Sequence, residues 1–187
     1  MNTEKQLHAL VVYESMFGCT EEIAHAVAEG LRLEGVAVEV NDVRNVAADV
    51  AEVDLLVVGA PTHAFSLSRP STRADAVRQG ARTGADSTGL REWLDAMRSQ
   101  PRPEGRLAAA FDTRVTKVRR LPKAASTRAA RLLGRLGYEL VSRPTAFLVQ
   151  DTRGPLAPGE VDHARTWGRV IALAARQRLD LTPAPVR

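Results

Sequence analysis

A short loop near the N-terminus brings together two hydroxyl side chains, a glycine and a cysteine. It reads Ser15-Met16-Phe17-Gly18-Cys19-Thr20 and separates an apolar run at 7–13 from a helical pattern. Free amides at a helix N-terminus, hydroxyl groups and a glycine that permits close approach suit a bound phosphate. The loop contains no Lys or Arg, so its amides would have to neutralise the anion. We therefore predict phosphate binding at 15–20.

The same loop is also compatible with an ordinary helix start. It is neither a Walker loop, which needs Gly-Lys-Ser/Thr, nor the G-x-G-x-x-G dinucleotide turn. Ser15 and Thr20 could be the turn and cap residues of such a helix. In the first case the loop binds a ligand, and in the second it only begins a helix.

Cys19 suggests a different chemistry. A cysteine at a helix N-terminus is expected to have a depressed pKa and some thiolate character. Low-molecular-weight phosphatases place such a nucleophile in the first loop of a doubly wound fold, with an Arg six positions later to hold the phosphoryl oxygens. Position 25 is His25, and the next arginine is Arg32. A phosphatase is therefore disfavoured, and Cys19 is better explained as a small loop residue.

A histidine lies in the second candidate loop, Gly59-Ala60-Pro61-Thr62-His63-Ala64-Phe65, which follows the apolar run 55–59. A protonatable side chain there could donate to a cofactor or relay protons, so His63 is the candidate catalytic residue. The alternative is a solvent-exposed loop histidine. The other histidines show no metal-ligand spacing, and we predict no metal site.

Alternating apolar runs and helical patterns must position these loops. We expect strands at 7–13, 36–40, 55–59, 106–111 and 138–149, the last bent at Pro144, with helices at 20–34, 90–98, 124–136 and 160–179. This order predicts an α/β fold with an open, doubly wound, five-stranded parallel sheet between two helix layers. Ligands of such sheets bind beyond the carboxyl ends of the strands. The loops to search are 14–20, 60–70, 111–123 and 150–157.

Length and composition favour one domain. The chain has 187 residues, 44% of them hydrophobic and 26% charged, and a single Cys, which excludes an internal disulfide. We expect one domain over 1–180 and a frayed tail at 181–187. No run approaches about 18 apolar residues, and the N-terminus lacks a signal-peptide pattern, so we expect a cytoplasmic protein without a membrane span.

Charge is distributed unevenly. Residues 1–60 carry 3 basic and 11 acidic groups, whereas 61–187 carry 23 basic and 11 acidic groups. Two Arg-rich stretches, 66–89 and 114–123, border the predicted crevice and could receive an NADPH phosphate or an anionic protein partner. The long stretch 66–89 suggests a lid or a partner contact, with a short helix at 74–79. Alternatively these are solvated loops, and the excess of Arg over Lys reflects genomic base composition. Without interleaved aromatic residues in 114–123, nucleic-acid binding is disfavoured.

The two loops together resemble a known family. Ser15-x-x-Gly18-x-Thr20 resembles the phosphate loop of flavodoxins, and the Pro61-Thr62 loop is similar to the Gly-x-Pro-Thr loop of flavodoxin-like quinone reductases. The likeness extends over roughly 7–178 and implies the strand order 2-1-3-4-5 and bound FMN. The implied phosphate contacts are Ser15, Phe17, Gly18, Cys19 and Thr20. The implied isoalloxazine contacts are Pro61, Thr62, His63, Phe65, Asp112, Thr113 and Arg114.

Departures from the family pattern bear on the activity. Phe17 replaces a second hydroxyl, and the loop after the fourth strand lacks the Gly-x-Gly-Asp and Tyr pattern of the electron carriers. Neither candidate flavin loop contains a Trp or Tyr. Both tryptophans, Trp93 and Trp167, fall on predicted helices. The carriers are also strongly acidic, whereas this chain has a net charge of +4. A one-electron shuttle is therefore disfavoured.

Two hypotheses follow. In the first, the chain is an FMN-dependent redox protein that takes electrons from NAD(P)H or a protein donor and passes them to an acceptor such as a quinone. In the second, it is a flavodoxin-fold binding module with weak or no FMN affinity, which binds an anionic partner through its Arg-rich loops. A homo-oligomer is compatible with either.

Overall fold

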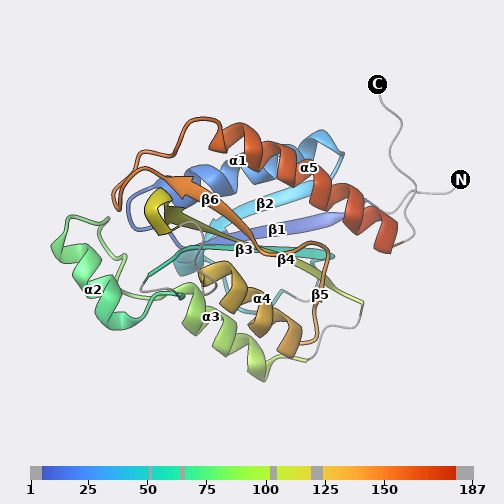
Figure 1. Ribbon diagram of the computed structural model, residues 1–187. Helices are drawn as coiled ribbons and strands as arrows, with labels where there is room; N and C mark the ends of the chain where they lie inside the picture. Colours follow the sequence, from blue (N-terminus) through green and yellow to red (C-terminus); the bar gives the residue numbers. More distant parts are fainter. Residues whose placement is uncertain (1–5, 51, 64–65, 102–104, 119–123, 180–187) are drawn as a thin grey trace, which may run out of the picture.

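The computed structural model describes residues 6–50, 52–63, 66–101, 105–118 and 124–179 (Figure 1). Phe65, three cations of the second Arg-rich stretch (Arg119, Arg120 and Lys123) and the predicted tail 181–187 therefore lie outside the described residues. Within the described ranges, no helix is both long enough and apolar enough to cross a membrane.

A parallel sheet forms the centre of the molecule. Its strands are β1 (His8–Tyr13), β2 (Ala37–Asp42), β3 (Leu55–Pro61), β4 (Leu107–Val115), β5 (Glu139–Leu140) and β6 (Thr145–Val149). The order is β2-β1-β3-β4-β5, with β6 also paired to β4, and every pairing is parallel. The predicted α/β class and the order 2-1-3-4-5 are confirmed.

The predicted single fifth strand at 138–149 is wrong. The chain forms β5 on Leu107–Ala108 and then β6 on Phe111–Val115, so the described sheet has six strands. Pro144 lies between the two strands and has no N–H to donate to a ladder, which explains the interruption.

Two helices cover each face of the sheet. The longer helices are α1 (Cys19–Leu33), α2 (Pro70–Arg78), α3 (Leu90–Ala96), α4 (Ala125–Arg135) and α5 (Glu160–Arg178). Figure 1 shows α1 and α5 on one face, α3 and α4 on the other, and α2 beside the edge where the strands end. Helix α2 is longer than the predicted 74–79, because Pro70 in its first turn has the fixed φ that favours a helix start.

Each face of the sheet has its own apolar core. On the α1/α5 face the ring of Phe111 lies edge-on to Phe147 and Trp167, with centroids 5.8 and 6.1 Å away. Phe111 is fully buried, so it belongs to the core and not to the crevice. Gly59 on the neighbouring strand must lack a side chain, since a Cβ there would lie 2.0 Å from the Phe111 ring.

Helices α1 and α5 pack with their backbones in contact. A Cβ on Gly30 would lie 2.0 Å from the carbonyl oxygen of Arg165, and a Cβ on Gly168 would lie 2.3 Å from that of Val27. Such distances require the helices to move apart. The core under this pair therefore depends on two glycines.

We expect Gly30→Ala to lower the free energy of unfolding by about 1–3 kcal/mol, because the added methyl overpacks a backbone contact. Gly134→Ala is the matched control, since Gly134 lies on α4 and a Cβ there meets no atom within 4 Å. It should raise the stability by about 0.5–1 kcal/mol through helix propensity alone. Urea unfolding of both variants measures the difference. Equal effects in the two variants would contradict close α1–α5 packing.

Candidate functional site

The loops predicted to bind a ligand gather at the carboxyl edge of the sheet. Strand β1 leads through 14–18 into α1, β3 leads into 62–69, and β6 leads into 150–159. The loop after β4 begins at Thr116 and not at Asp112 as predicted, because β4 continues to Val115. The 14–18 loop thus lies between segments from three other parts of the chain.

The first loop leaves the N-terminus of α1 open to an anion. Gly18 adopts a left-handed backbone with φ of +104°, and its N–H donates to the Oγ of Ser15 at 3.1 Å. The first internal bond of α1 runs from the Glu22 N–H to the Gly18 carbonyl at 3.0 Å. The N–H groups of Cys19, Thr20 and Glu21 precede it and have no intrahelical acceptor. These donors, with the helix dipole, favour negative charge.

Thr20 and Thr113 meet, although they are far apart in the sequence. Their hydroxyl oxygens lie 2.8 Å apart and both side chains are buried. The Thr20 hydroxyl, expected at the phosphate, is therefore already hydrogen-bonded to β4. The Thr20 hydroxyl can still form a further hydrogen bond, and a ligand could provide the partner.

An arginine of the predicted 66–89 stretch, which the sequence did not assign to the first loop, lies over that loop. One terminal nitrogen of Arg82, Nη2, lies 3.1 Å from the position of a Cβ on Gly18, while Nη1 donates to Glu21 on the first turn of α1. The Arg82 N–H donates to the Met16 carbonyl at 3.1 Å, which fixes the backbone beside the loop. Arg82 therefore supplies the positive charge that 15–20 itself lacks.

A chain of polar contacts holds Arg82 in place. The Tyr13 hydroxyl donates to Glu21 at 2.9 Å, and burial together with this carboxylate raises the pKa of Tyr13 to about 12. Although burial works against it, hydrogen bonds from Tyr13 and Arg82 lower the pKa of Glu21. Arg44 donates to the Thr83 carbonyl at 3.0 Å, next to Arg82. The 82–84 segment is thus attached at two points.

The expectation of a thiolate at Cys19 is wrong. Burial, followed by the neighbouring Glu22 carboxylate, raises the pKa of the Cys19 thiol. Its sulfur lies 2.7 Å from the position of a Cβ on Gly154, so the loop after β6 passes close over it. Burial and the neighbouring carboxylate both disfavour the thiolate. Cys19 is a thiol in a crowded position, which leaves a phosphatase without its nucleophile.

The second loop is partly engaged in holding the fold. The Thr62 N–H donates to the Thr113 carbonyl at 2.9 Å, and its Oγ1 accepts the Ala125 N–H at the start of α4 at 3.0 Å. His63 and Ser66 exchange two backbone hydrogen bonds of 2.9 Å. The His63 ring is half-buried, and burial followed by the charge of Arg73 lowers its pKa. At neutral pH this ring is uncharged.

Asp112 and Arg114 do not form a loop at the crevice as predicted. They lie in β4 and pair through two hydrogen bonds of 2.7 and 2.6 Å, and both are buried. Asp112 also accepts the Ser126 N–H at 3.2 Å. Neither side chain reaches a ligand without breaking this pair.

The 66–89 segment, expected to be a lid or a partner contact, is held by buried charges. Arg73 is 1% exposed and donates to Ser68 at 3.1 Å and to Glu92 at 3.0 Å. Glu14, directly before Ser15, accepts the Leu90 N–H at 2.7 Å. Burial raises the pKa of Glu14 in spite of the nearby Arg73. This segment is therefore attached to the first loop from inside.

The structure brings some predicted residues together and separates others. Those that lie at one edge of the sheet around α1 are Ser15, Phe17, Gly18, Cys19, Thr20, Pro61, Thr62, His63 and Thr113. Asp112 and Arg114 lie below them inside the sheet. Among the described residues no group of three or more His, Cys, Asp or Glu side chains could hold a metal ion.

Comparison with known proteins agrees with this geometry. A family model described as a flavodoxin domain matches residues 10–71. Over 57 residues, 28% of this chain, the sequence is 40% identical to a coenzyme F420H(2) oxidase of Methanothermobacter marburgensis. The matched stretch accounts for only 14% of that oxidase.

Solved structures share the fold over most of the chain. The rubredoxin:oxygen oxidoreductase of Desulfovibrio gigas superposes with a TM-score of 0.65 and 18% identity, over 94% of this chain and 38% of that protein. Flavodoxin 2 of Bacillus cereus superposes with a TM-score of 0.65 and 19% identity, over 89% of this chain and 98% of its own. At such identities the likeness establishes the fold alone.

The depressed pKa of His63 predicts a pH dependence of stability. As the pH falls through the ordinary histidine value of 6.5, the unfolded chain binds the proton first, so the free energy of unfolding should decrease. The decrease should stop once the pH is below the native pKa, and His63 should contribute no pH dependence above about pH 7.5. Urea unfolding of the wild type and His63→Gln between pH 5 and 8 measures this. Parallel curves would show that His63 titrates normally.

Proposed function

We propose that this chain, whose residues 10–71 match a flavodoxin domain and whose fold is that of flavodoxins, is an FMN-binding redox protein, which passes electrons from NAD(P)H or a protein donor to an acceptor such as a quinone. One observation carries the proposal. The N-terminus of α1, at the carboxyl edge of the sheet, combines unpaired amides, a left-handed glycine and an arginine. A phosphomonoester is the chemical group that such a site fits best.

The residues present fit the FMN phosphate. Ser15, Phe17, Gly18, Cys19 and Thr20 would hold it through backbone amides and hydroxyl groups. A side chain on Gly18 would meet the Arg82 guanidinium at 3.1 Å, so the absent Cβ leaves the room for close approach. Arg82 is 47% exposed and can turn toward an anion while remaining anchored through its backbone N–H. Its charge would offset that of the phosphate.

The isoalloxazine would lie against the second loop. Pro61, Thr62 and His63 follow β3, and Phe65 belongs to the same loop; Thr113 lies on the adjacent strand. Bound flavin would supply the electron-accepting chemistry. The chain would orient the ring and exclude water. His63, uncharged at pH 7, would accept or donate one hydrogen bond at the edge of the ring and would hold a proton only at lower pH.

The alternative function, a module that binds an anionic partner through its Arg-rich loops, loses part of its support. Arg73 of the 66–89 stretch is buried, and Arg91, which follows that stretch on α3, donates to the Ser68 and Leu67 carbonyls at 3.0 and 2.9 Å. Arg114 is paired with Asp112 inside the sheet. These cations stabilise the fold and are not free for a partner. The redox proposal places its ligand in the same crevice and does not require these arginines to be free.

We expect FMN to bind the purified protein and Arg82→Gln to weaken this binding about tenfold or more, because a charge-assisted contact to the phosphate is lost. Riboflavin, which has the same ring and no phosphate, should bind wild type and variant equally. Flavin fluorescence quenching measures both affinities. Arg78→Gln is the matched control, since Arg78 is 71% exposed on α2 and pairs with Asp75. It should leave FMN affinity unchanged.

A second variant tests whether the positive charge of Arg82 favours FMN binding. Glu21→Gln removes a carboxylate beside the loop and frees Arg82 from its ion pair, so it should tighten FMN binding. Replacing Ser15 or Thr20 with a bulky acid should abolish binding.

If micromolar FMN changes neither the visible spectrum nor the melting temperature, the redox proposal is wrong and the binding module is favoured. With FMN bound, NAD(P)H oxidation with and without a quinone separates a reductase from a carrier.

A further inference from the structure

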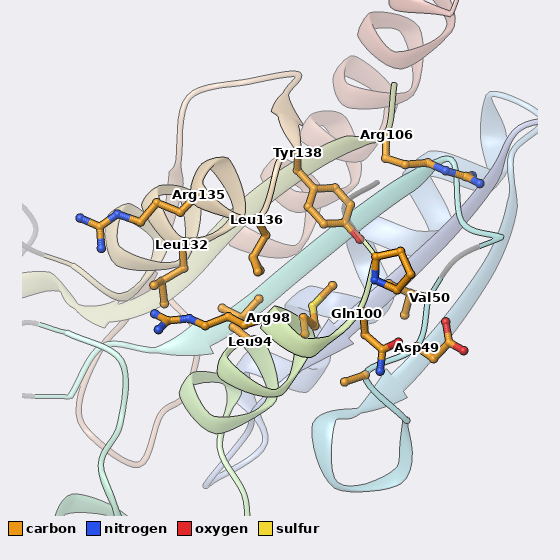
Figure 2. Close-up of a pocket in the computed structure, with 13 residues that line it drawn as sticks. Asp49, Val50, Leu94, Arg98, Gln100, Arg106, Leu132, Arg135, Leu136 and Tyr138 are labelled. Atoms are coloured by element: carbon orange, nitrogen blue, oxygen red, sulfur yellow. The ribbon is translucent and has the colours of Figure 1, made fainter. Parts of the chain in front are cut away.

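The amino edge of the sheet, opposite the candidate flavin site, contains a cavity of about 620 Å³. It lies between the C-terminal ends of α3 and α4, the segment before β3 and the starts of β4 and β5 (Figure 2). This volume is within the range of small-molecule sites, about 300–1,000 Å³. The proposed redox function does not use it.

The floor of the cavity is apolar. Leu94 and Met97 come from the end of α3, and Leu132 and Leu136 come from the end of α4. The first three are buried and belong to the core on this face, whereas Leu136 is half-buried. Figure 2 shows Leu94, Leu132 and Leu136 in the middle of the cavity. A hydrocarbon chain or ring would replace water here favourably.

Three arginines line the cavity. Arg98 pairs with Asp95 at 3.1 Å, and Arg106 pairs with Asp54 at 3.5 Å. Arg135 is exposed and has no carboxylate partner in the described part of the chain. In Figure 2 the guanidinium groups of Arg98 and Arg135 lie on the same side of the cavity. Asp49 also lines the cavity, and Figure 2 shows it on the side away from these two arginines. A ligand carboxylate would therefore be favoured at the Arg135 side and disfavoured near Asp49.

Tyr138 provides a polar group on the opposite side. Its ring is buried, and Figure 2 shows its hydroxyl directed into the cavity. This hydroxyl forms no hydrogen bond with any residue that the structure describes. Burial raises the pKa of Tyr138, in spite of the nearby Arg106, so the group is a protonated donor at neutral pH. The hydroxyl faces the open space of the cavity, where an acceptor atom of a ligand could bind it.

We propose that this cavity binds an amphipathic carboxylate, with its apolar part on the leucine floor and its anionic group near Arg135. The charge of Arg135 favours an anion over a neutral lipid on that side of the cavity, away from Asp49. The four apolar side chains favour an aliphatic body over a sugar or a nucleotide. The site lies at the edge of the sheet opposite α2 and the first loop, so its occupation does not require the flavin site.

Octanoate, with octanol as its uncharged counterpart, tests the proposal by isothermal titration of the full chain with and without saturating FMN. Octanoate should bind in both cases, and octanol more weakly. Arg135→Glu should weaken octanoate binding about tenfold, and Tyr138→Phe about fivefold. Leu136→Trp, which fills the cavity, should abolish it. Arg131→Glu is the matched control, because Arg131 is an exposed residue of the same helix that does not line the cavity, and it should have no effect.

The proposal is overturned if millimolar octanoate does not bind, if octanol binds equally well, or if Arg135→Glu and Leu136→Trp leave the affinity unchanged. Arg135 is at the surface, so its variant remains informative even if Leu136→Trp unfolds. FMN affinity measured on the same variants should equal that of the wild type. This separates a failure of the cavity proposal from a failure of the flavin proposal.

Discussion

The buried guanidinium of Arg73 is the interaction on which the candidate site depends. A charge at 1% exposure is tolerated only when it is paired and hydrogen-bonded, and Glu92 and Ser68 provide those partners. Glu14 lies in the same cluster and is the residue directly before the first loop, so the loop and the 66–89 segment are held to one buried cluster. Removing Glu92 would leave the buried Arg73 guanidinium without its carboxylate partner.

This attachment explains the uneven charge along the sequence. The acidic first third and the Arg-rich remainder are partly two halves of one network, because Glu21 and Asp42 accept from Arg82 and Arg44. Although burial opposes it, the hydrogen bonds from Arg44 lower the pKa of Asp42. Several of the basic side chains are therefore paired with acidic side chains of the same chain. The part that remains unpaired near the first loop is smaller than the sequence suggests.

Patterns within one element were predictable, and contacts between distant elements were not. Apolar runs and helical periodicity indicate the strands and helices, and the hydroxyl and glycine pattern locates the first loop. The polar character of 112–114 predicts a loop, but a buried ion pair between Asp112 and Arg114 allows a strand to continue through it. Arg82 lies over Gly18 only after folding, and no local signal indicates this. At Cys19 the helix position was visible, whereas the desolvation that raises its pKa was not.

The two edges of the sheet also differ in the sign of their helix dipoles. At the carboxyl edge the N-termini of α1 and α4 favour an anion, so a single arginine suffices to complete the proposed phosphate site. At the amino edge α3 and α4 end, and their C-terminal carbonyls favour cations. Arg98 lies in the short helical turn that directly follows α3, and Arg135 lies in the last turn of α4, where the dipole favours cations, which accounts for arginines at these positions without any ligand. It does not account for the apolar cavity beside them or for the unpaired hydroxyl of Tyr138. An anion can bind at the amino edge only because arginine side chains reverse the local sign of the backbone field. Recognition of an anion at this edge would therefore depend on side chains. At the carboxyl edge, recognition of the proposed phosphate would depend mainly on backbone amides.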